Sequence, residues 1–212
     1  MANPLYPTTP VPDQPYVITD TYKTLSSPEF DSGKQTFKQL RNYPRFNATL
    51  TYGSNPSHFK WSDIWSLYSF FVQMKGSALT FDFIDFNGWD SSPIGIQWPN
   101  LYIGVGTGAT TSFDVPMTSS SSFKLYNNGV DITNNLWVSG AFNDPMWKFH
   151  AGAGANGRDN IEFYTAPLAG HILEWYSVGQ RVVVAHFNAD VVSLNAFSNM
   201  LASTGLAIQE VK

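Results

Sequence analysis

The chain has 212 residues, of which 43% are hydrophobic, 16% are aromatic and only 13% are charged. The net charge of −4 argues against a protein that grips nucleic acid by neutralising phosphates, and the absence of cysteine excludes disulfides, thiolate nucleophiles and cysteine-ligated zinc. Soluble domains carry about 25% charged residues, so we expect self-assembly to cover part of this surface. A monomeric β-sandwich rich in aromatic residues is the alternative.

The N-terminal segment is rich in proline. Five prolines between Pro4 and Pro15 predict an extended arm over residues 1–15, of the kind that lies on a neighbouring subunit. The segment lacks the basic and apolar regions of a secretory signal, and no run in the chain approaches the ~20 apolar residues of a membrane span. We therefore expect a protein made in the cytoplasm, without membrane insertion.

Strands are predicted at residues 16–24, 34–40 and 45–52, followed by a helix. Ser62 or Asp63 can cap the helix, and Gly76 can end it. One face has helical spacing: Ile64, Leu67, Tyr68, Phe71 and Met74. The other face is also apolar, with Trp65, Phe70 and Val72, so the helix is expected to have two packing partners.

After Gly76 the apolar period changes to two. Phe81 and Phe83 then share one face of a predicted strand, whereas Asp82 is expected on the solvent-facing side, with Asp85 in the turn that follows. Residues 99–172 contain short strands bounded by turns, which predicts a small inserted all-β module. Residues 181–187, 191–194 and 206–211 are expected to return to the first sheet, and 195–203 is interpreted as a short helix. The predicted fold is mainly β with one packed helix.

Candidate chemical sites are weak. Glycines 104, 106 and 108 precede a strand and not a helix, which argues against a phosphate loop. The glycine-rich segment 151–157 is interpreted as a mobile loop tip. No EF-hand spacing accompanies Asp82, Asp85 and Asp90, and the four histidines form no metal-binding motif.

We predict no enzyme activity, no catalytic residues, no metal and no cofactor. One alternative stays open. Glu162 and Glu174 would suit a glycosidase only at a carboxylate separation that sequence does not give.

Several segments, in order, resemble the distal tail (hub) proteins of long-tailed phages and gene transfer agents. Residues 61–76 follow Trp-x-x-Ile-x-x-Leu-x-x-Phe-Phe-x-x-x-x-Gly, and Phe81-Asp-Phe-Ile-Asp85 is similar to the strand after that family's helix. Further similar segments are Gly104-Val-Gly-Thr-Gly108 with Thr111-Ser-Phe113, Tyr126-Asn-Asn-Gly129-Val, the Ala-Pro-x-x-Gly turn at 166–170, residues 182–190, and the C-terminal Ala207-Ile-Gln-Glu-Val-Lys212. His186 departs from the family, which usually has arginine there, so a salt bridge made by that arginine is not expected.

The resemblance implies a structural component of the virion. Residues 1–98 and 173–212 would form a tail-tube-like β-barrel or sandwich domain, and residues 99–172 would form the outward-facing module. Copies would assemble into a hexameric ring at the tail tip, in contact with the tail tube protein and with hub, fibre or receptor-binding proteins. DNA would only pass through the lumen, which the acidic charge suits.

Aromatic residues are the site candidates. Those expected in the assembly core and interface are Trp61, Trp65, Phe70, Phe71, Phe81, Phe83 and Phe187. The alternative function is a carbohydrate-binding β-sandwich module, in which sugar rings would stack on Trp137, Trp147 or Trp175.

Overall fold

The computed structural model describes residues 3–13, 17–21, 24–26, 37–39, 45–53, 60–86, 89–90, 101–192, 194–198 and 201–211. These residues are mainly β with one α-helix, which confirms the predicted fold class. The chain forms two compact units. We call them the helix unit (Pro4–Asp82 and Val183–Lys212) and the sandwich unit (Met1–Asn3 and Phe83–Val182).

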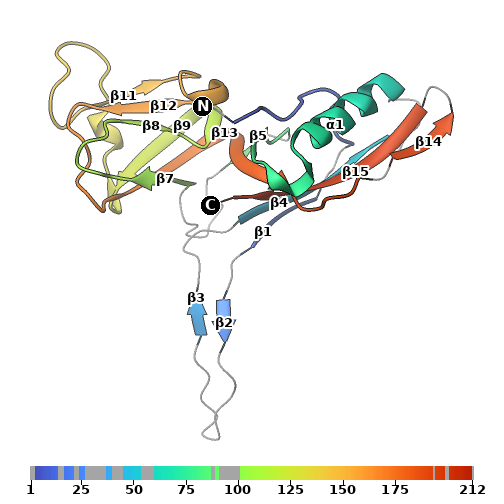
Figure 1. Cartoon of the computed structure of the whole chain (residues 1–212). Coiled ribbons are helices and arrows are strands. Elements are labelled where there is room, and N and C mark those ends of the chain that lie inside the picture. Colours follow the sequence, from blue (N-terminus) through green and yellow to red (C-terminus); the bar gives the residue numbers. More distant parts are fainter. Residues whose placement is uncertain are drawn as a thin grey trace, which may run out of the picture. The chain divides into compact units, whose positions relative to one another are not determined.

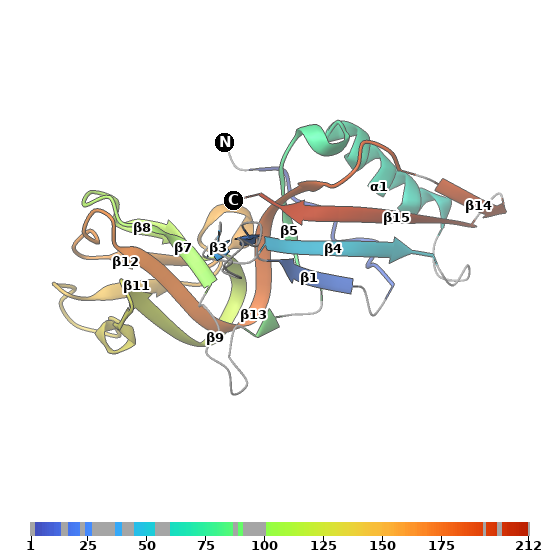
Figure 2. The same ribbon diagram turned by 90° about the horizontal axis from the view of Figure 1, so that it is seen from below.

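The sheet of the helix unit is antiparallel. Strand β4 (Arg45–Tyr52) lies between β1 (Val17–Thr21) and β15 (Leu201–Glu210), as Figure 2 shows. Strand β15 also pairs with β14 (Leu194–Ser198) and with the end of β13 (Ile172–Phe187). Buried residues alternate with more exposed ones along β4, because successive side chains of a strand point to opposite faces. Strands β2 (Thr24–Ser26) and β3 (Phe37–Gln39) form a separate antiparallel pair.

Helix α1 (Trp61–Gln73) packs along β15 (Figure 1). At its start the Asp63 carboxylate accepts a hydrogen bond from the backbone N–H of Lys60 (3.2 Å), so of the two predicted capping residues Asp63 bonds the helix start. Lys75 and Gly76 are both left-handed and end the helix. A short 3₁₀ turn, η1 (Gly76–Ala78), then leads into β5 (Phe81–Ile84).

The proline-rich arm lies on its own chain in residues 4–13. The backbone N–H of Tyr6 donates to the Asp82 carbonyl (2.8 Å), and the Asp82 N–H donates to the Pro4 carbonyl (2.8 Å). Farther along, the Asp13 N–H donates to the Thr51 carbonyl (2.8 Å). This part of the arm is therefore anchored on strands of its own unit, which satisfy these backbone groups.

The sandwich unit consists of two antiparallel sheets (Figure 1). In one sheet β13 lies between β7 (Leu101–Val105) and β9 (Met117–Asn127), with β10 (Val130–Asp131) beside β9 and β6 (Trp89–Asp90) on β13. In the other, β12 (Asn160–Phe163) lies between β11 (Trp147–His150) and β8 (Ser112–Asp114). The two sheets share one core, which includes Leu101, Leu125, Trp147, Ile161, Phe163, Leu173 and Trp175.

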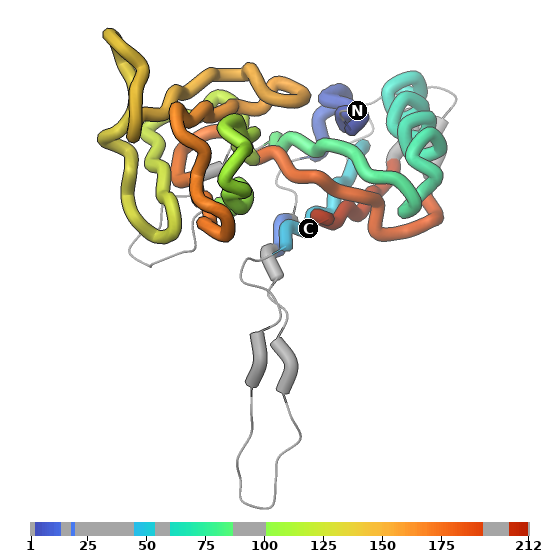
Figure 3. The backbone as a smooth tube through the Cα atoms, turned by 60° about the vertical axis from the view of Figure 1, so that its left-hand side comes forward, coloured from blue at the N-terminus to red at the C-terminus, as the bar shows by residue number. Residues whose placement is uncertain are grey.

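The connections of this unit are held by hydrogen bonds. Figure 3 shows the long excursion after β10, which contains η2 (Thr133–Asn135) and returns as β11. The glycine-rich segment around η3 (Ala155–Gly157), predicted as a mobile tip, is bonded at two points. The Gly152 N–H donates to Asp159 Oδ1 (2.9 Å), and the Ala155 N–H donates to Asp114 Oδ2 (3.0 Å).

The sandwich unit has wider bounds than the predicted 99–172 module. It begins at Phe83 in the middle of β5 and ends at Val182 in the middle of β13. The reason is that the first half of β13 pairs with β7 and β9 and supplies Leu173 and Trp175 to the sandwich core.

Two further predictions are wrong. Residues 195–203 were expected to form a helix, but those of them that the structure describes, 195–198 and 201–203, belong to the antiparallel pair of β14 and β15, in which Leu194 lies opposite Thr204. Asp82 was expected on the solvent-facing side of the strand and Asp85 in the turn that follows, yet both side chains are buried. Side chains on both faces of β5 are buried. The period of two therefore predicts the strand correctly, but it does not predict which side chains are exposed.

Candidate functional site

An aromatic cluster forms the centre of the helix unit. Phe187 of β13 lies 4.8 Å from Phe81, 5.0 Å from Phe71 and 6.2 Å from Phe70, measured between ring centroids. Tyr6 from the arm joins it at 6.3 Å from Phe187. All of these side chains are buried, so the cluster is a core within one chain. Of the residues predicted for the assembly core and interface, these four phenylalanines are unavailable to a neighbour. Phe83, also predicted, is fully buried and contacts Phe86.

The outer side of α1 carries a second apolar row, which we call the outer stripe: Trp61, Trp65, Tyr68 and Val72. The intervals of four, three and four residues place these side chains on one face of the helix. Trp61 is 37% exposed, Trp65 53% and Val72 54%, while Tyr68 is half-buried. The ring centroids of Trp61 and Trp65 are 6.4 Å apart, and those of Trp65 and Tyr68 are 5.1 Å apart. The rings therefore form a continuous row.

The outer side of α1 has little charge. Asp63 in the first turn is the only charged residue between Trp61 and Gln73. Ser62, Ser66 and Ser69 flank the outer stripe and are exposed. The outer face of a surface helix normally carries charged and polar side chains, whereas protein interfaces favour aromatic residues and exclude charge from their centre. The outer stripe thus has the composition of an interface, and Trp61 and Trp65 are the predicted residues that remain exposed.

The junction after α1 fixes how the helix end joins the sheet. A Cβ on Gly76 would lie 2.9 Å from Asp190 Oδ1, so only glycine fits there without a shift. Asp190 accepts hydrogen bonds from the backbone N–H of Ser77 (3.0 Å) and from its hydroxyl. These two hydrogen bonds lower the pKa of the Asp190 carboxyl.

A groove lies beside β11 in the sandwich unit. Its volume is about 390 Å³, and we call it the Trp137 groove. Leu136 and Trp137 line it from the excursion, Phe123 from β9, and Lys148, Phe149 and His150 from β11. The groove combines aromatic walls with two basic side chains.

Trp137 is held in one orientation. Its Nε1–H donates to the Gly140 carbonyl (3.1 Å), and the ring of Phe142 meets it edge-on at 6.3 Å. Lys148 Nζ lies 4.8 Å from the centroid of Trp137 and 4.1 Å from that of Phe142, which places its charge against both rings. Tyr164 continues the aromatic group at 5.4 Å from Phe142.

The other two predicted stacking residues are inaccessible. Trp147 and Trp175 are fully buried in the sandwich core, and their ring centroids are 6.2 Å apart. The prediction that they offer a platform for sugar rings is wrong, because both rings point between the sheets. Trp137 alone of the three is part of a groove.

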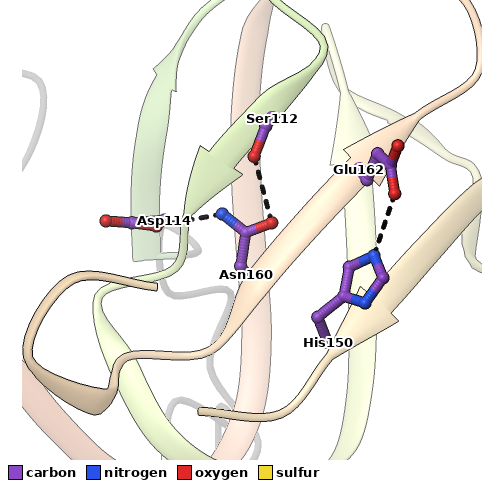
Figure 4. Close-up of polar contacts among 5 residues, drawn as sticks. All are labelled: Ser112, Asp114, His150, Asn160 and Glu162. Carbon is purple, nitrogen blue, oxygen red and sulfur yellow. Dashed lines mark hydrogen bonds and ion pairs between the residues drawn. The ribbon is translucent and has the colours of Figure 1, made fainter. Parts of the chain in front are cut away.

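Polar side chains cover the outer face of the sheet formed by β8, β12 and β11 (Figure 4). His150 Nε2 lies 3.0 Å from Glu162 Oε2. The side-chain amide of Asn160 donates to Asp114 Oδ1 (2.9 Å), and the Ser112 hydroxyl donates to Asn160 Oδ1 (3.1 Å). Sequence reasoning took His150 and Glu162 separately. Side chains alternate between the two faces of β11 and β12, and this alternation predicts that His150 and Glu162 share a face only once the register of the two strands is known.

The remaining candidate sites have structural roles. The Gly106 N–H donates to the His171 carbonyl (2.8 Å), and the Gly108 N–H donates to the Pro167 carbonyl (2.9 Å). Both amides are therefore bonded within the chain and are not available to bind a phosphate. Glu162 and Glu174 follow inward-facing Ile161 and Leu173 in different sheets. Both glutamates therefore point outward from opposite sides of the sandwich, which contradicts a glycosidase pair.

No group of three or more histidine and acidic side chains is placed to hold a metal ion within the described ranges. Of the residues that the structure covers, none forms a helix with both the length and the hydropathy of a membrane span.

Comparison with known proteins identifies no family. The chain matches no protein-family model and no curated protein sequence.

Proposed function

We propose that the protein is a structural subunit of a phage tail tip, a distal tail protein whose copies form a ring between the tail tube and the tip. The observation that carries the proposal is the outer stripe of α1. It offers Trp61, Trp65 and Val72 to a neighbour on a helix face without a basic residue. Association through such a face buries apolar area, which is favourable, and does not require a basic side chain to be desolvated.

The low charge of the whole chain supports the same proposal. With only 13% charged residues, the surface is poorly suited to remain fully exposed in a monomer. A closed ring needs two different complementary surfaces on each subunit. In this proposal the outer stripe is one of the two, and it docks on another surface of the next copy.

The segments that resemble the phage family contact one another in the structure. Gly76, which follows the helix, packs against Asp190, and Phe81 packs against Phe187. In the sandwich unit the Gly170 N–H donates to the Gly106 carbonyl (3.0 Å). The matching residues therefore occupy packed structural positions within each unit.

The two units then divide the proposed work. The helix unit builds the ring, and the sandwich unit supports hub, fibre or receptor-binding proteins. The tail tube protein is the other neighbour, and DNA passes through a lumen of acidic subunits. The protein acts in the virion as a scaffold, without catalysis, metal or cofactor.

The decisive experiment measures the particle mass of the full chain by mass photometry and images the particles by negative-stain electron microscopy. We expect rings, with a hexamer as the main species, in the presence of the tail tube protein or at high concentration. Trp65→Glu places a charge within the outer stripe and should abolish the rings while the far-UV circular dichroism stays unchanged.

Ser66→Glu is the matched control, because it adds the same charge to the same helix beside the stripe. It should reduce ring formation less than Trp65→Glu does. A chain that stays monomeric under all of these conditions would contradict the proposal, as would rings that tolerate Trp65→Glu.

A further inference from the structure

We propose that the Trp137 groove is a docking slot for an extended strand of a partner protein, in which apolar side chains alternate with acidic ones. The inference deepens the proposed role of the sandwich unit as a support for other tail proteins, and it rests on that role only for the identity of the partner. All residues that line the groove belong to one unit, so the slot is complete within a single chain.

Strand β11 has an open edge at this groove. It is an end strand of its three-stranded sheet, with β12 on one side. The Tyr164 N–H donates to the Met146 carbonyl (3.0 Å), and successive residues of an antiparallel strand bond alternately to the two sides. Lys148 and His150 therefore bond to β12, whereas the backbone groups of Phe149 point to the other side. Among the described strands, none pairs with Phe149 on that side.

The chain itself shows that this edge accepts a strand. Just before the groove, the Trp137 N–H donates to the Trp147 carbonyl (2.7 Å), and Leu136 lies beside Trp147 in a parallel bridge. The excursion then leaves β11, and Val138, the next residue, is 81% exposed. Phe149, two residues beyond Trp147, lines the groove where the pairing stops. A partner strand can continue the backbone pairing from there.

The groove is lined from both faces of β11, as a slot for a strand must be. On the inner face Phe149 lies 4.6 Å from Phe123, and both rings are only partly buried although they pack against the sandwich core. Lys148 and His150 point to the opposite face, because the side chains of a strand alternate, and Lys148 contacts Trp137 there. A strand added at this edge would alternate in the same way. One set of its side chains would cover the two phenylalanines, and the other set would face the basic residues.

The charges of the groove select the partner. Of the described residues that line it, Lys148 and His150 are basic and none is acidic. The Lys148 ammonium lies against the rings of Trp137 and Phe142, so an acidic side chain of the partner gains an ion pair with it, whereas a lysine is repelled. His150 already contacts Glu162 (Figure 4), which leaves most of the selection to Lys148. Apolar side chains on the inner-facing positions gain burial against Phe123 and Phe149.

The test uses the full chain and short fluorescein-labelled peptide probes, measured by fluorescence anisotropy at low ionic strength. The first probe alternates valine or phenylalanine with glutamate. The second has lysine in place of each glutamate, and the third has the residues of the first grouped into an apolar block and an acidic block. We expect the first probe to bind, and the other two to bind about tenfold more weakly or not at all.

Hydrogen exchange followed by NMR tests the strand pairing directly. In the unaltered chain, the first probe should slow the exchange of the Phe149 amide, because that N–H becomes hydrogen-bonded to the added strand. A peptide that rests on the aromatic rings without pairing to β11 would not slow it. This measurement needs no substitution, so it does not depend on whether a variant folds.

Lys148→Glu should invert the charge preference, so that the lysine probe binds more tightly than the glutamate probe. Lys124→Glu is the matched control, because Lys124 is exposed on β9 of the same unit and does not line the groove. It should leave the preference unchanged. Ring formation is tested at Trp65 in the other unit, so each proposal can fail while the other stands.

Three outcomes would overturn the inference. The glutamate probe could bind no better than the block probe, it could bind without slowing exchange at Phe149, or its preference over the lysine probe could survive Lys148→Glu in a folded protein. A dimer of the chain that is lost in Lys148→Glu would assign the groove to a second copy, and this result would overturn the inference as well.

Discussion

The two faces of α1 carry similar residues in different surroundings. The inner face carries Ile64, Leu67, Phe70 and Phe71, which are buried against the unit's own sheet and aromatic cluster. The outer stripe is just as apolar, yet Trp65 and Val72 stay more than half exposed in the single chain. Helical spacing thus predicts the helix, whereas the elements that lie opposite each face decide which side chains are buried. Substitutions on the inner face should therefore change folding stability, and those on the outer face should change assembly.

The largest expected effect is at the centre of the inner cluster. Phe187→Ala removes the ring that Phe71 and Phe81 both contact, so the free energy of unfolding should fall by about 3–5 kcal/mol. Urea denaturation followed by tryptophan fluorescence measures it. Phe187→Leu keeps most of the volume and should show a smaller loss. An equal loss from Val72→Ala on the outer stripe would erase the distinction between the two faces.

The next effect is at the helix end. Gly76→Ala introduces a Cβ at positive φ, 2.9 Å from Asp190 Oδ1, and we expect it to lower the free energy of unfolding by about 2–3 kcal/mol through strain and overlap together. Gly129→Ala is a matched control. Its φ is also positive, but nothing lies within 4 Å of the new Cβ, so it should lose only about 1 kcal/mol. Equal losses would show that the contact with Asp190 is unimportant.

A smaller effect is expected at the buried pair of Tyr6 and Tyr52, whose hydroxyl oxygens are 2.9 Å apart. Burial raises the pKa of both phenols above the value of about 10 in the unfolded chain. The unfolded chain therefore releases protons that the folded chain retains, and stability present below about pH 10 is lost as the pH rises further.

Tyr52→Phe removes the hydrogen bond and one of these groups. It should lower stability at neutral pH by about 1 kcal/mol and make the alkaline decline shallower in a series of urea titrations. Tyr164→Phe changes an exposed tyrosine and should alter neither quantity. An alkaline decline of unchanged slope in Tyr52→Phe would show that this pair does not set it.

The smallest effect on folding is expected on the outer stripe. Trp65→Ser should change the free energy of unfolding of the single chain by no more than about 0.5 kcal/mol, because the side chain is more than half exposed. The same substitution should shift the particle mass from ring to monomer. A large loss of stability without any change in mass would assign Trp65 to the core of one chain.

The sequence predicts α1 well because several independent signals agree there. The apolar spacing and Gly76 predict the end of the helix, which is observed at Gln73 and is followed by left-handed Lys75 and Gly76. The start lies earlier than predicted, because Lys60 is the N-cap residue and Asp63 lies within the first turn. The segment 195–203 lacked such agreement. Its residues are compatible with a helix, and only the pairing of β14 with β15, in which Leu194 lies opposite Thr204, makes its described residues strands.

Exposure is harder to predict than element type. Asp82 is polar in a strand of alternating pattern, but the arm crosses its backbone at Pro4 and Tyr6 and helps to bury it. Trp137, Trp147 and Trp175 are the same residue in similar β-rich surroundings, and only the register and the sheet packing separate the groove residue from the two core residues. These are long-range facts that no local pattern contains.

Strand β13 continues for 16 residues, from Ile172 to Phe187, and serves both units in turn. A truncation after residue 172 would remove Leu173 and Trp175, so a fragment covering 99–172 would expose the indole of Trp147 and aggregate. Protein engineers who wish to transplant the sandwich unit onto another scaffold should keep β13 through Val182 and join the graft there. The same continuity links the two folding units mechanically, since tension applied to one end of β13 is transmitted to the other through covalent bonds.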